Sequence, residues 1–224
     1  MTSTNQGTKR GAFIVLEGLD RSGKTTQVKL LEQRFVEEGR PVKMMRFPDR
    51  STTIGKMIDG YLKSEVEMED HVIHLIFSAN RWEAAKQITT LLESGTTVVC
   101  DRYYHSGMVY SAAKHNPTLP LSWARAPERG LPRPDAVVFL DLEEEAAAAR
   151  GGWGGELYEK KEMQRRVREI FEELGRKGGE DGEDLAVVGA GGSVEEVAEM
   201  VWGVVRERVE MVERGELGGV RRIE

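Results

Sequence analysis

The chain has a single cysteine, Cys100, among 224 residues, and it lacks any apolar run approaching the ~20 residues that a membrane helix needs. One cysteine excludes an internal disulfide and a thiolate cage around a metal, and it fits a reducing compartment. The first eleven residues lack the apolar core of a signal peptide. We therefore expect a cytoplasmic protein, with the nucleus as an alternative, and no association with membranes.

A surplus of basic residues is also missing, because 38 Asp and Glu outnumber 32 Lys and Arg and give a formal net charge of −6. Nucleic acids and anionic lipids usually bind basic surfaces, so nucleic acid is not an expected partner. An anionic ligand would have to bind a local cluster of Arg and Lys. With 39% hydrophobic side chains, the chain suffices for one compact core. We predict one domain over 11–214, between a disordered tail over 1–10 and a tail over 215–224.

Residues Gly18 to Thr25 match the pattern G-x-x-x-x-G-K-[ST]. The motif directly follows the apolar run 13–16 and leads into a segment of helical period, so it lies where a buried strand would turn into a helix. Glycines let several backbone N–H groups surround a polyphosphate at the positive end of the helix dipole. Lys24 adds a full charge, and the Thr25 hydroxyl can ligate Mg²⁺. These features predict a phosphate-binding loop.

Short apolar runs alternate with longer segments of helical period along the chain. Continuous apolar runs indicate strands buried on both faces, as in a parallel sheet flanked by helices. The predicted strands cover 13–16, 42–47, 96–100, 136–140 and 185–188. The predicted helices cover 24–38, 70–92, 103–114, 143–150, 158–174 and 193–213. The predicted fold class is α/β, doubly wound.

Two glycine-rich segments interrupt this alternation. Residues 151–155, Gly-Gly-Trp-Gly-Gly, lie between two predicted helices. We interpret them as the hinge of a mobile lid, over about 150–158, that closes over a nucleotide and excludes water. Residues 175–184 are polar and charged and contain no apolar anchor, so we expect a solvated surface loop there.

Arginines cluster where predicted strands end. Arg46-Phe-Pro-Asp-Arg50 ends the second strand, and Asp101-Arg102 follows the third. Carboxyl ends of strands in a doubly wound sheet converge on the ligand crevice, so both segments would face the phosphate-binding loop and imply more than one phosphate group. For Arg46, and for Arg81 on the third helix, a surface ion pair is the alternative. Arg81 shares a helix face with Phe77, which suits a planar base, although spacing alone favours Phe77 as ordinary core.

These motifs together resemble the thymidylate kinases of eukaryotic type, a family of P-loop nucleoside monophosphate kinases. The resemblance runs from about residue 11 to 164. The matching phrases are Val15-Leu-Glu-Gly-Leu-Asp-Arg-Ser-Gly-Lys24, Arg46-Phe-Pro-Asp-Arg-Ser51, Glu69-Asp-His71, His74-Leu-Ile-Phe-Ser-Ala-Asn-Arg-Trp82, Asp101-Arg-Tyr103, Ser106-Gly107 and Gly130-Leu-Pro-Arg-Pro-Asp135. The resemblance implies a P-loop NTPase fold with a five-stranded parallel sheet, Mg²⁺ as cofactor, and transfer of the γ-phosphate of ATP to dTMP, giving dTDP for dTTP biosynthesis.

The resemblance also implies a role for each matching residue toward dTMP. Phe77 would stack on thymine and Arg81 would hydrogen-bond its carbonyl edge. The acceptor 5′-phosphate would be held by Arg50 and Arg102. The 3′-hydroxyl would bind Asp20, the 2′ position would be crowded by Tyr158, and the other side of the base would be lined by Gln164 and Tyr110. The complete implied set is Asp20, Phe47, Arg50, Phe77, Arg81, Arg102, Ser106, Gly107, Tyr110, Tyr158 and Gln164.

For ATP, the implied set is Gly18, Arg21, Ser22, Gly23, Lys24, Thr25, Thr26 and Arg150. The implied metal-binding residues are Thr25 and Asp101, and the implied catalytic residues are Arg21, Lys24, Asp101 and Arg102. In this family the arginine beside the γ-phosphate comes from the P-loop or from the lid. Because 151–157 contains no basic residue, we expect Arg21 to be that arginine and Arg150 to touch donor phosphates or brace the lid. A helix-terminal cation is the alternative for Arg150.

The sequence departs from the family in three places. Leu157 stands where lids of the family often carry Arg, Tyr103-Tyr104-His105 is bulkier and more polar than expected, and the loop 175–184 is long. The adenine-contacting turn, around 189–192, aligns loosely. Family members generally form homodimers, for which the apolar face of Val72 to Ile76 with Ile88 and Leu91 is a candidate, although the same residues could belong to the intramolecular core.

Two other classes were weighed against this resemblance. A GTPase-type switch should show an Asp-x-x-Gly turn and an Asn-Lys-x-Asp guanine reader, which do not occur in those contexts. A deoxynucleoside kinase is the closer alternative, but it needs a carboxylate that deprotonates a sugar 5′-hydroxyl, whereas dTMP offers an ionised phosphate that needs cations. Arg50 at the end of the second strand favours the monophosphate.

Overall fold

The computed structural model describes residues 10–143, 146–147, 156–179 and 181–224. Five parallel strands form one sheet in the order β2-β3-β1-β4-β5. Their bounds are β1 Phe13–Gly18, β2 Val42–Arg46, β3 Thr97–Asp101, β4 Ala136–Asp141 and β5 Leu185–Gly189. The predicted α/β class and all five predicted strands are confirmed, since continuous apolar runs are what a sheet covered on both faces requires.

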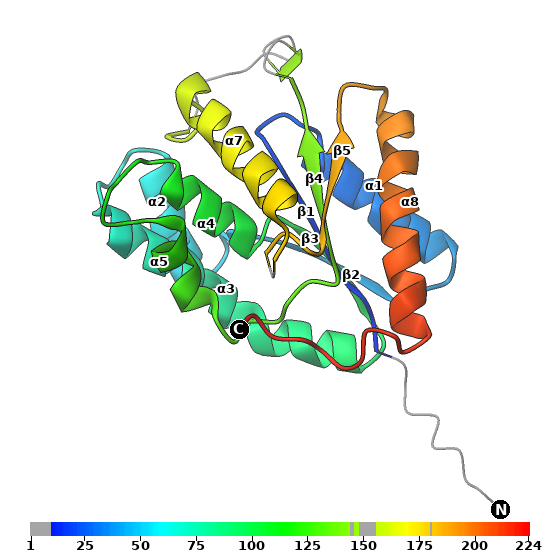
Figure 1. Cartoon of the computed structure of the whole chain (residues 1–224). Coiled ribbons are helices and arrows are strands. Elements are labelled where there is room, and N and C mark those ends of the chain that lie inside the picture. The colour runs from blue at the N-terminus through cyan, green and yellow to red at the C-terminus, as the bar shows by residue number, and fades with distance from the viewer. Residues whose placement is uncertain (1–9, 144–145, 148–155, 180) are drawn as a thin grey trace, which may run out of the picture.

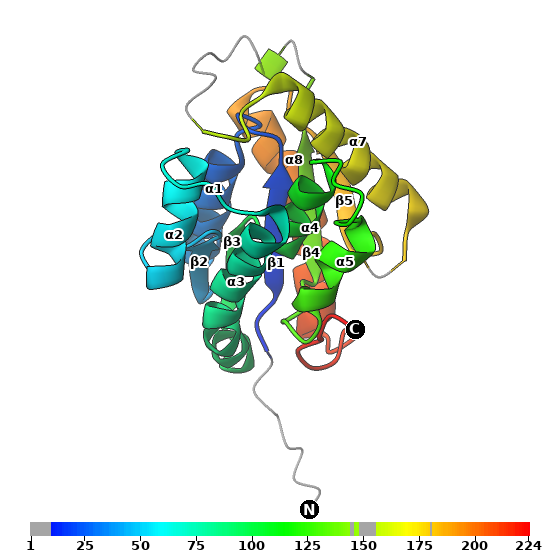
Figure 2. The same ribbon diagram turned by 90° about the vertical axis from the view of Figure 1, so that its left-hand side faces the viewer.

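Helices lie on both faces of the sheet. The described helices are α1 Lys24–Glu37, α2 Thr53–Leu62, α3 Asp70–Glu93, α4 Tyr104–Ala112, α5 Leu121–Arg125 with the 3₁₀ turn η1 Ala126–Glu128, α7 Lys161–Lys177 and α8 Val194–Glu213. One face is covered by α1 and α8, and the opposite face by α3, α4 and α7 (Figures 1 and 2). Because helices cover both faces of the sheet, a ligand binds at the edge formed by the carboxyl ends of the strands.

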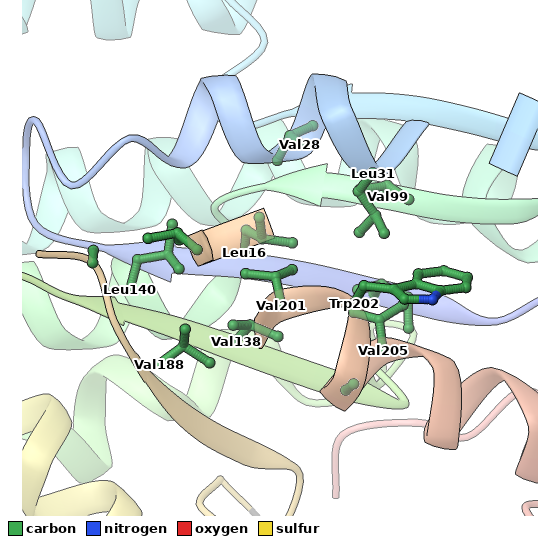
Figure 3. Close-up of a cluster of buried hydrophobic side chains, with 14 of the residues drawn as sticks. Leu16, Val28, Leu31, Val99, Val138, Leu140, Val188, Val201, Trp202 and Val205 are labelled. Carbon is green, nitrogen blue, oxygen red and sulfur yellow. The ribbon is translucent and has the colours of Figure 1, made fainter. Parts of the chain in front are cut away.

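The main core lies between the sheet and the pair α1 and α8, where side chains of all three elements interlock (Figure 3). Its fully or almost fully buried members include Leu16, Val28, Val138, Val201 and Val205. A second cluster fills the space beneath α3 and α4, and a third packs α7 against β4. Every residue of β1 is buried, so the loop that follows this strand starts from a firmly packed strand in the middle of the sheet.

Two short helices, α2 and α5, were not predicted. For α2 a signal was present: the Thr52 hydroxyl caps the helix by accepting from the Gly55 N–H at 2.9 Å, and Ile58 and Leu62 are buried on one side. The helix predicted over 158–174 begins only at Lys161 and runs on to Lys177. Most of the helix predicted over 143–150, the residue Arg150 and the lid hinge 151–155 lie outside the described residues.

The loop 175–184 is not the solvated surface loop that its composition predicted. The Asp184 carboxylate is buried and accepts hydrogen bonds from Arg133 and Arg221 at 2.8 and 3.0 Å. Asp181 accepts from Arg125 at 2.7 Å and from the Tyr104 hydroxyl at 3.1 Å. The local composition predicted the wrong environment because the arginines that bind these acids come from distant parts of the chain. Without those partners, a segment rich in acids and glycine has the composition of a solvated loop.

The segment 215–224, which we had separated from the domain, folds back onto it. Ile223 is 2% exposed, its N–H donates to the Leu131 carbonyl at 3.0 Å and its carbonyl accepts from the Gly130 N–H at 2.7 Å. An isolated antiparallel bridge joins Pro132 to Arg222 alongside. These contacts make the end of the chain part of the packed domain.

Candidate active site

The phosphate-binding loop joins β1 to α1 at the carboxyl edge of the sheet. Gly18 approaches β4 so closely that a Cβ there would lie 2.7 Å from the Leu140 carbonyl oxygen, and its φ is +149°. Gly23 caps α1 in a left-handed conformation, with φ 89° and ψ 10°. Having no side chain, Gly23 cannot accept from the first N–H groups of α1, which therefore stay directed at whatever lies before the helix. This geometry is that of an anion-binding helix N-terminus.

Lys24 lies beneath this loop with its ammonium group buried. Its Nζ donates to the Leu19 carbonyl at 2.5 Å. Burial lowers the pKa of Lys24 to about 7, and the nearby Arg102 guanidinium acts in the same direction. An anion bound in the loop would restore the charged form of Lys24, because an opposite charge within a few ångströms favours it.

Thr25 and Asp101 come together beside the loop, as the predicted metal-binding pair requires. The Thr25 hydroxyl donates to Asp101 Oδ2 at 2.8 Å, and Arg46 Nη2 donates to the same two oxygens at 2.7 and 2.8 Å. Although burial alone would raise the pKa of Asp101, the positive charges of Arg102 and Lys24 lower it below its ordinary value. The result is an ionised carboxylate beside a hydroxyl oxygen, at the end of β3.

Three distant segments meet around Asp20. Arg102 Nη2 donates to Asp20 Oδ1 at 2.5 Å, and Gln164 Nε2, on α7, donates to Asp20 Oδ2 at 2.8 Å. The Gln164 side-chain oxygen in turn accepts from the Asp20 N–H at 2.9 Å. Gln164 lies behind the P-loop as a buried support, and its Nε2 is 3.4 Å from the Tyr110 hydroxyl.

Glu17 is a site residue that the sequence analysis missed. Its fully buried carboxylate accepts from the N–H groups of Tyr103 and Ser106 at 2.9 and 3.1 Å and from the Ser106 hydroxyl at 2.5 Å. These bonds hold the start of α4 and the turn at Arg102, whose φ is +66°. The available signal was an acid inside an otherwise apolar strand, because a buried carboxylate must find donors.

Phe77 and Arg81 both face the cleft from α3, as their shared helix face predicted. Phe77 is half-buried and packs against the cluster formed by α2 and α3, so it serves the core and the cleft together. Arg81 forms an ion pair, as the alternative foresaw, but a buried one: its Nε and Nη2 donate to the two oxygens of Glu128, the Nε bond measuring 2.8 Å. Glu128 is the second residue that the sequence analysis missed.

Arg50 lies across the cleft from the P-loop and is partly exposed. Its Nη1 and Nη2 donate to the two carboxylate oxygens of Glu156 at 2.7 and 3.0 Å, and Nη1 also donates to Asp59 at 2.8 Å. The hydrogen bonds that Arg50 donates to Glu156 raise the pKa of Arg50. Ion pairs at this exposure are weak, so a phosphate can replace them.

Tyr158 lines the same cleft as Arg50. Its ring packs against those of Tyr61 and Tyr110, with centroids 6.0 and 5.5 Å away. Leu157, the departure in the lid, bonds through its N–H to the Leu62 carbonyl at 2.9 Å and packs against the α2 cluster. Leu157, at the end of the predicted lid, is therefore anchored to α2 by a backbone hydrogen bond and apolar contact.

Most of the predicted site residues surround one cleft of about 890 Å³. It is lined by the predicted residues Asp20, Arg21, Gly23, Lys24, Thr25, Thr26, Phe47, Arg50, Phe77, Arg81, Asp101, Arg102, Ser106, Gly107, Tyr110 and Tyr158. Gly18, Ser22 and Gln164 support the lining from behind, and Arg150 lies outside the described residues. An anion-binding loop that shares its cleft with a second group of arginines defines a phosphotransferase of the P-loop class, with room for two phosphorylated molecules.

Comparison with known proteins narrows this class. Residues 16–201 match the family described as Thymidylate kinase. A thymidylate kinase of Schizosaccharomyces pombe is 47% identical over 84% of this chain and 88% of its own length. The thymidylate kinase of Homo sapiens is 46% identical over 74% of this chain and 77% of its own length. A solved structure of thymidylate kinase from Candida albicans superimposes with a TM-score of 0.80 at 34% identity, covering 96% of this chain and 99% of the other.

The chain therefore belongs to the thymidylate kinase family and is an ATP-binding transferase of nucleotide biosynthesis. Over the described part of the chain, the helices are too short or too polar to cross a membrane.

Proposed function

We propose that this enzyme transfers the γ-phosphate of ATP to the 5′-phosphate of dTMP, giving dTDP, with the two nucleotides end to end in the cleft. The observation that carries the proposal is that the P-loop, Arg50 and Arg102 all line one cleft of about 890 Å³. Phosphoryl transfer requires alignment and charge neutralisation more than covalent chemistry, and this cleft offers cations on both sides of the transfer point.

On the donor side, the backbone N–H groups of the P-loop and the Lys24 ammonium bind the triphosphate. Arg21 stands in the P-loop with a φ of +69°, a conformation unusual for a non-glycine residue, and its Nη2 lies 4.0 Å from Glu159 Oε2. We assign to Arg21 the stabilisation of charge on the transferred phosphoryl group, and to Arg150 a contact with donor phosphates. The turn over 189–192 is the proposed neighbour of the adenine.

Mg²⁺ fits the pair Thr25 and Asp101. This hard cation prefers oxygen ligands and usually takes only one or two from the protein, completing its shell with water and phosphate oxygens. Among the described residues, no group of three or more acids, histidines or cysteines could hold a metal ion. The Thr25 hydroxyl and the ionised Asp101 carboxylate, 2.8 Å apart, supply the one or two protein oxygens that Mg²⁺ needs. When bound, the ion neutralises charge on the β- and γ-phosphate oxygens.

On the acceptor side, Arg50 and Arg102 bind the 5′-phosphate, Phe77 stacks on the thymine and Arg81 donates to its carbonyl edge. The Asp20 carboxylate is positioned by Gln164 to accept from the 3′-hydroxyl. Phe47, Ser106, Gly107 and Tyr110 complete the pocket, and Tyr158 crowds the 2′ position. Because the nearby positive charges of Arg102 and Lys24 lower the pKa of Asp101, this carboxylate is a poor base for a sugar hydroxyl, which disfavours a nucleoside kinase.

The test is a coupled assay with ATP and Mg²⁺, comparing dTMP and thymidine as acceptors. We expect turnover of dTMP, none of thymidine, and loss of activity when a chelator removes Mg²⁺. Phosphorylation of thymidine without phosphorylation of dTMP would overturn the proposal in favour of a deoxynucleoside kinase.

We further propose a homodimer through α3. Val72 and Leu75 are 48% and 47% exposed one turn apart on this helix. Ile88, which the sequence placed on the same face, is fully buried in the core and so belongs to no interface. The enzyme is assigned to the cytoplasm or nucleus, in keeping with the free, buried thiol of Cys100.

A further inference from the structure

We infer that Glu128 is a positioning residue that makes the Arg81 end of the cleft selective for an uncharged, carbonyl-bearing base, and that it thereby sets the direction in which the acceptor nucleotide lies. This inference rests on the proposed function. It concerns a residue outside the described cleft lining, which acts through Arg81 rather than by touching substrate.

Glu128 fixes one edge of the Arg81 guanidinium. The two carboxylate oxygens accept from Nε and Nη2, with the Nε bond at 2.8 Å, which is the two-pronged geometry that orients a guanidinium most firmly. The side chains of Arg81 and Glu128 are 3% and 0% exposed. Because they stand on α3 and on the η1 turn, only the folded chain brings them together.

The α4 backbone fixes the guanidinium from a second direction. A Cβ added to Gly107 would lie 2.5 Å from Arg81 Nη2 and 2.9 Å from both Cζ and Nη1. Glycine at this position therefore lets the guanidinium rest against α4. Within the described part of the chain Arg81 Nη1 makes no hydrogen bond, and Arg81 lines the cleft, so Nη1 is the donor left for a ligand.

Glu128 also balances the charge of Arg81 inside the protein. The neighbouring His74 Nε2 lies 4.0 Å from Glu128 Oε1, and burial lowers the pKa of His74 to about 4, so this imidazole stays neutral. The pair Arg81 and Glu128 is thus close to electrically neutral. A phosphate placed beside it would bring its negative charge next to a buried carboxylate that cannot move into water, which is unfavourable.

The opposite end of the cleft behaves differently. The side chains of Arg50 and of its partners Asp59 and Glu156 are 39%, 26% and 32% exposed, so these acids can exchange for a phosphate at little cost. The buried pair cannot separate in this way, because separation would leave an uncompensated charge in the interior. A nucleoside monophosphate therefore lies with its phosphate at Arg50 and with a carbonyl oxygen at Arg81 Nη1. A base presenting an amino group there would leave this donor unpaired.

The test replaces Glu128 by Gln, which preserves shape and removes the charge. In the variant Glu128→Gln we expect the KM for dTMP to rise roughly 10-fold or more, the scale of a lost charge-assisted hydrogen bond, with the KM for ATP nearly unchanged. The preference for dTMP over dCMP should fall, and inorganic phosphate should become a stronger competitor of dTMP. The variant Glu128→Asp retains the charge and should keep the resistance to inorganic phosphate while weakening dTMP binding.

The matched control is Asp135→Asn, which breaks another buried ion pair, with Arg10, away from the cleft. It should lower the thermal stability while leaving both KM values and the dTMP preference unchanged. If Glu128→Gln does not fold, the Glu128→Asp measurements decide. Equal rises in both KM values, or a folded Glu128→Gln with unaltered dTMP binding and selectivity, would overturn the inference. Failure of the unmodified enzyme to phosphorylate dTMP would instead overturn the proposed function.

Discussion

Arg50 and Glu156 form a two-pronged ion pair, with Nη1 and Nη2 of Arg50 donating to the two Glu156 carboxylate oxygens at 2.7 and 3.0 Å. Glu156 lies within the predicted lid, in the segment that leads into α7, whereas Arg50 follows β2. The proposed acceptor phosphate and this carboxylate therefore compete for the same guanidinium. The pair couples acceptor binding to the position of residues near the lid.

Replacement of Arg50 by Ala removes the cation at the acceptor end alone. We expect the KM for dTMP to rise roughly 10-fold or more, as for a lost hydrogen bond between charged groups, and the KM for ATP to change little. Steady-state kinetics with each substrate varied in turn checks this. The control is Arg165→Ala, an exposed arginine paired within α7. Equal changes in both KM values would show that Arg50 contacts a different phosphate.

Replacement of Arg21 by Ala tests the proposed charge stabilisation during transfer. Arginines that act on the transferred phosphoryl group contribute about 10³-fold or more to turnover, so we expect kcat to fall by that order with smaller changes in KM. Arg21→Lys keeps the charge without the planar fork and should recover only part of the loss. A kcat within a few-fold of the unmodified enzyme would remove Arg21 from the mechanism.

Lys24 predicts a proton uptake on ATP binding. Its pKa of about 7 in the folded protein means that the group is largely neutral at pH 8, and a bound triphosphate would restore the charge. Calorimetry at pH 8 in buffers of different ionisation enthalpy should reveal uptake of a substantial fraction of a proton. Lys24→Met should show none, and equal uptake in this variant would assign the proton to another group.

The same pKa shift has a consequence for stability. Because the folded-state pKa of about 7 lies below the ordinary lysine value of 10.5, the unfolded chain binds more protons between these two pH values. The contribution of Lys24 to stability therefore decreases as the pH falls from 10.5 towards 7. Lys24→Met should flatten the pH dependence of the midpoint of thermal unfolding in this window, and an unchanged dependence would contradict the assignment.

The proposed dimer predicts a monomer when its apolar face is charged. Leu75→Arg places a cation at a position that is 47% exposed and apolar, so it should shift the sedimentation or light-scattering mass from dimer to monomer without unfolding the domain. Val36→Arg, at an exposed valine on α1, is the control and should leave the mass unchanged. A monomeric unmodified protein, or a Leu75→Arg dimer, would exclude this interface.

Local sequence determined the features that depend on a few adjacent residues. The P-loop followed from glycines and Lys24 between an apolar run and a helical segment, since its backbone conformation is set within eight positions. The five strands followed from their continuous apolar runs, and the shared face of Phe77 and Arg81 followed from the helical repeat. The resemblance to thymidylate kinases, carried by these same motifs, is confirmed by relatives at 46–47% identity.

Only the tertiary structure decided which charged groups meet. Asp20 and Gln164, 144 positions apart, bond because α7 packs against α4 and shares a buried cluster with Leu19 of the P-loop. Arg81 meets Glu128 because α3 packs against the η1 turn. The acids of the loop 175–184 likewise proved to be buried partners of distant arginines. The local sequence around a charged side chain does not reveal its partner. The pairing depends on burial and on the topology that brings remote segments together.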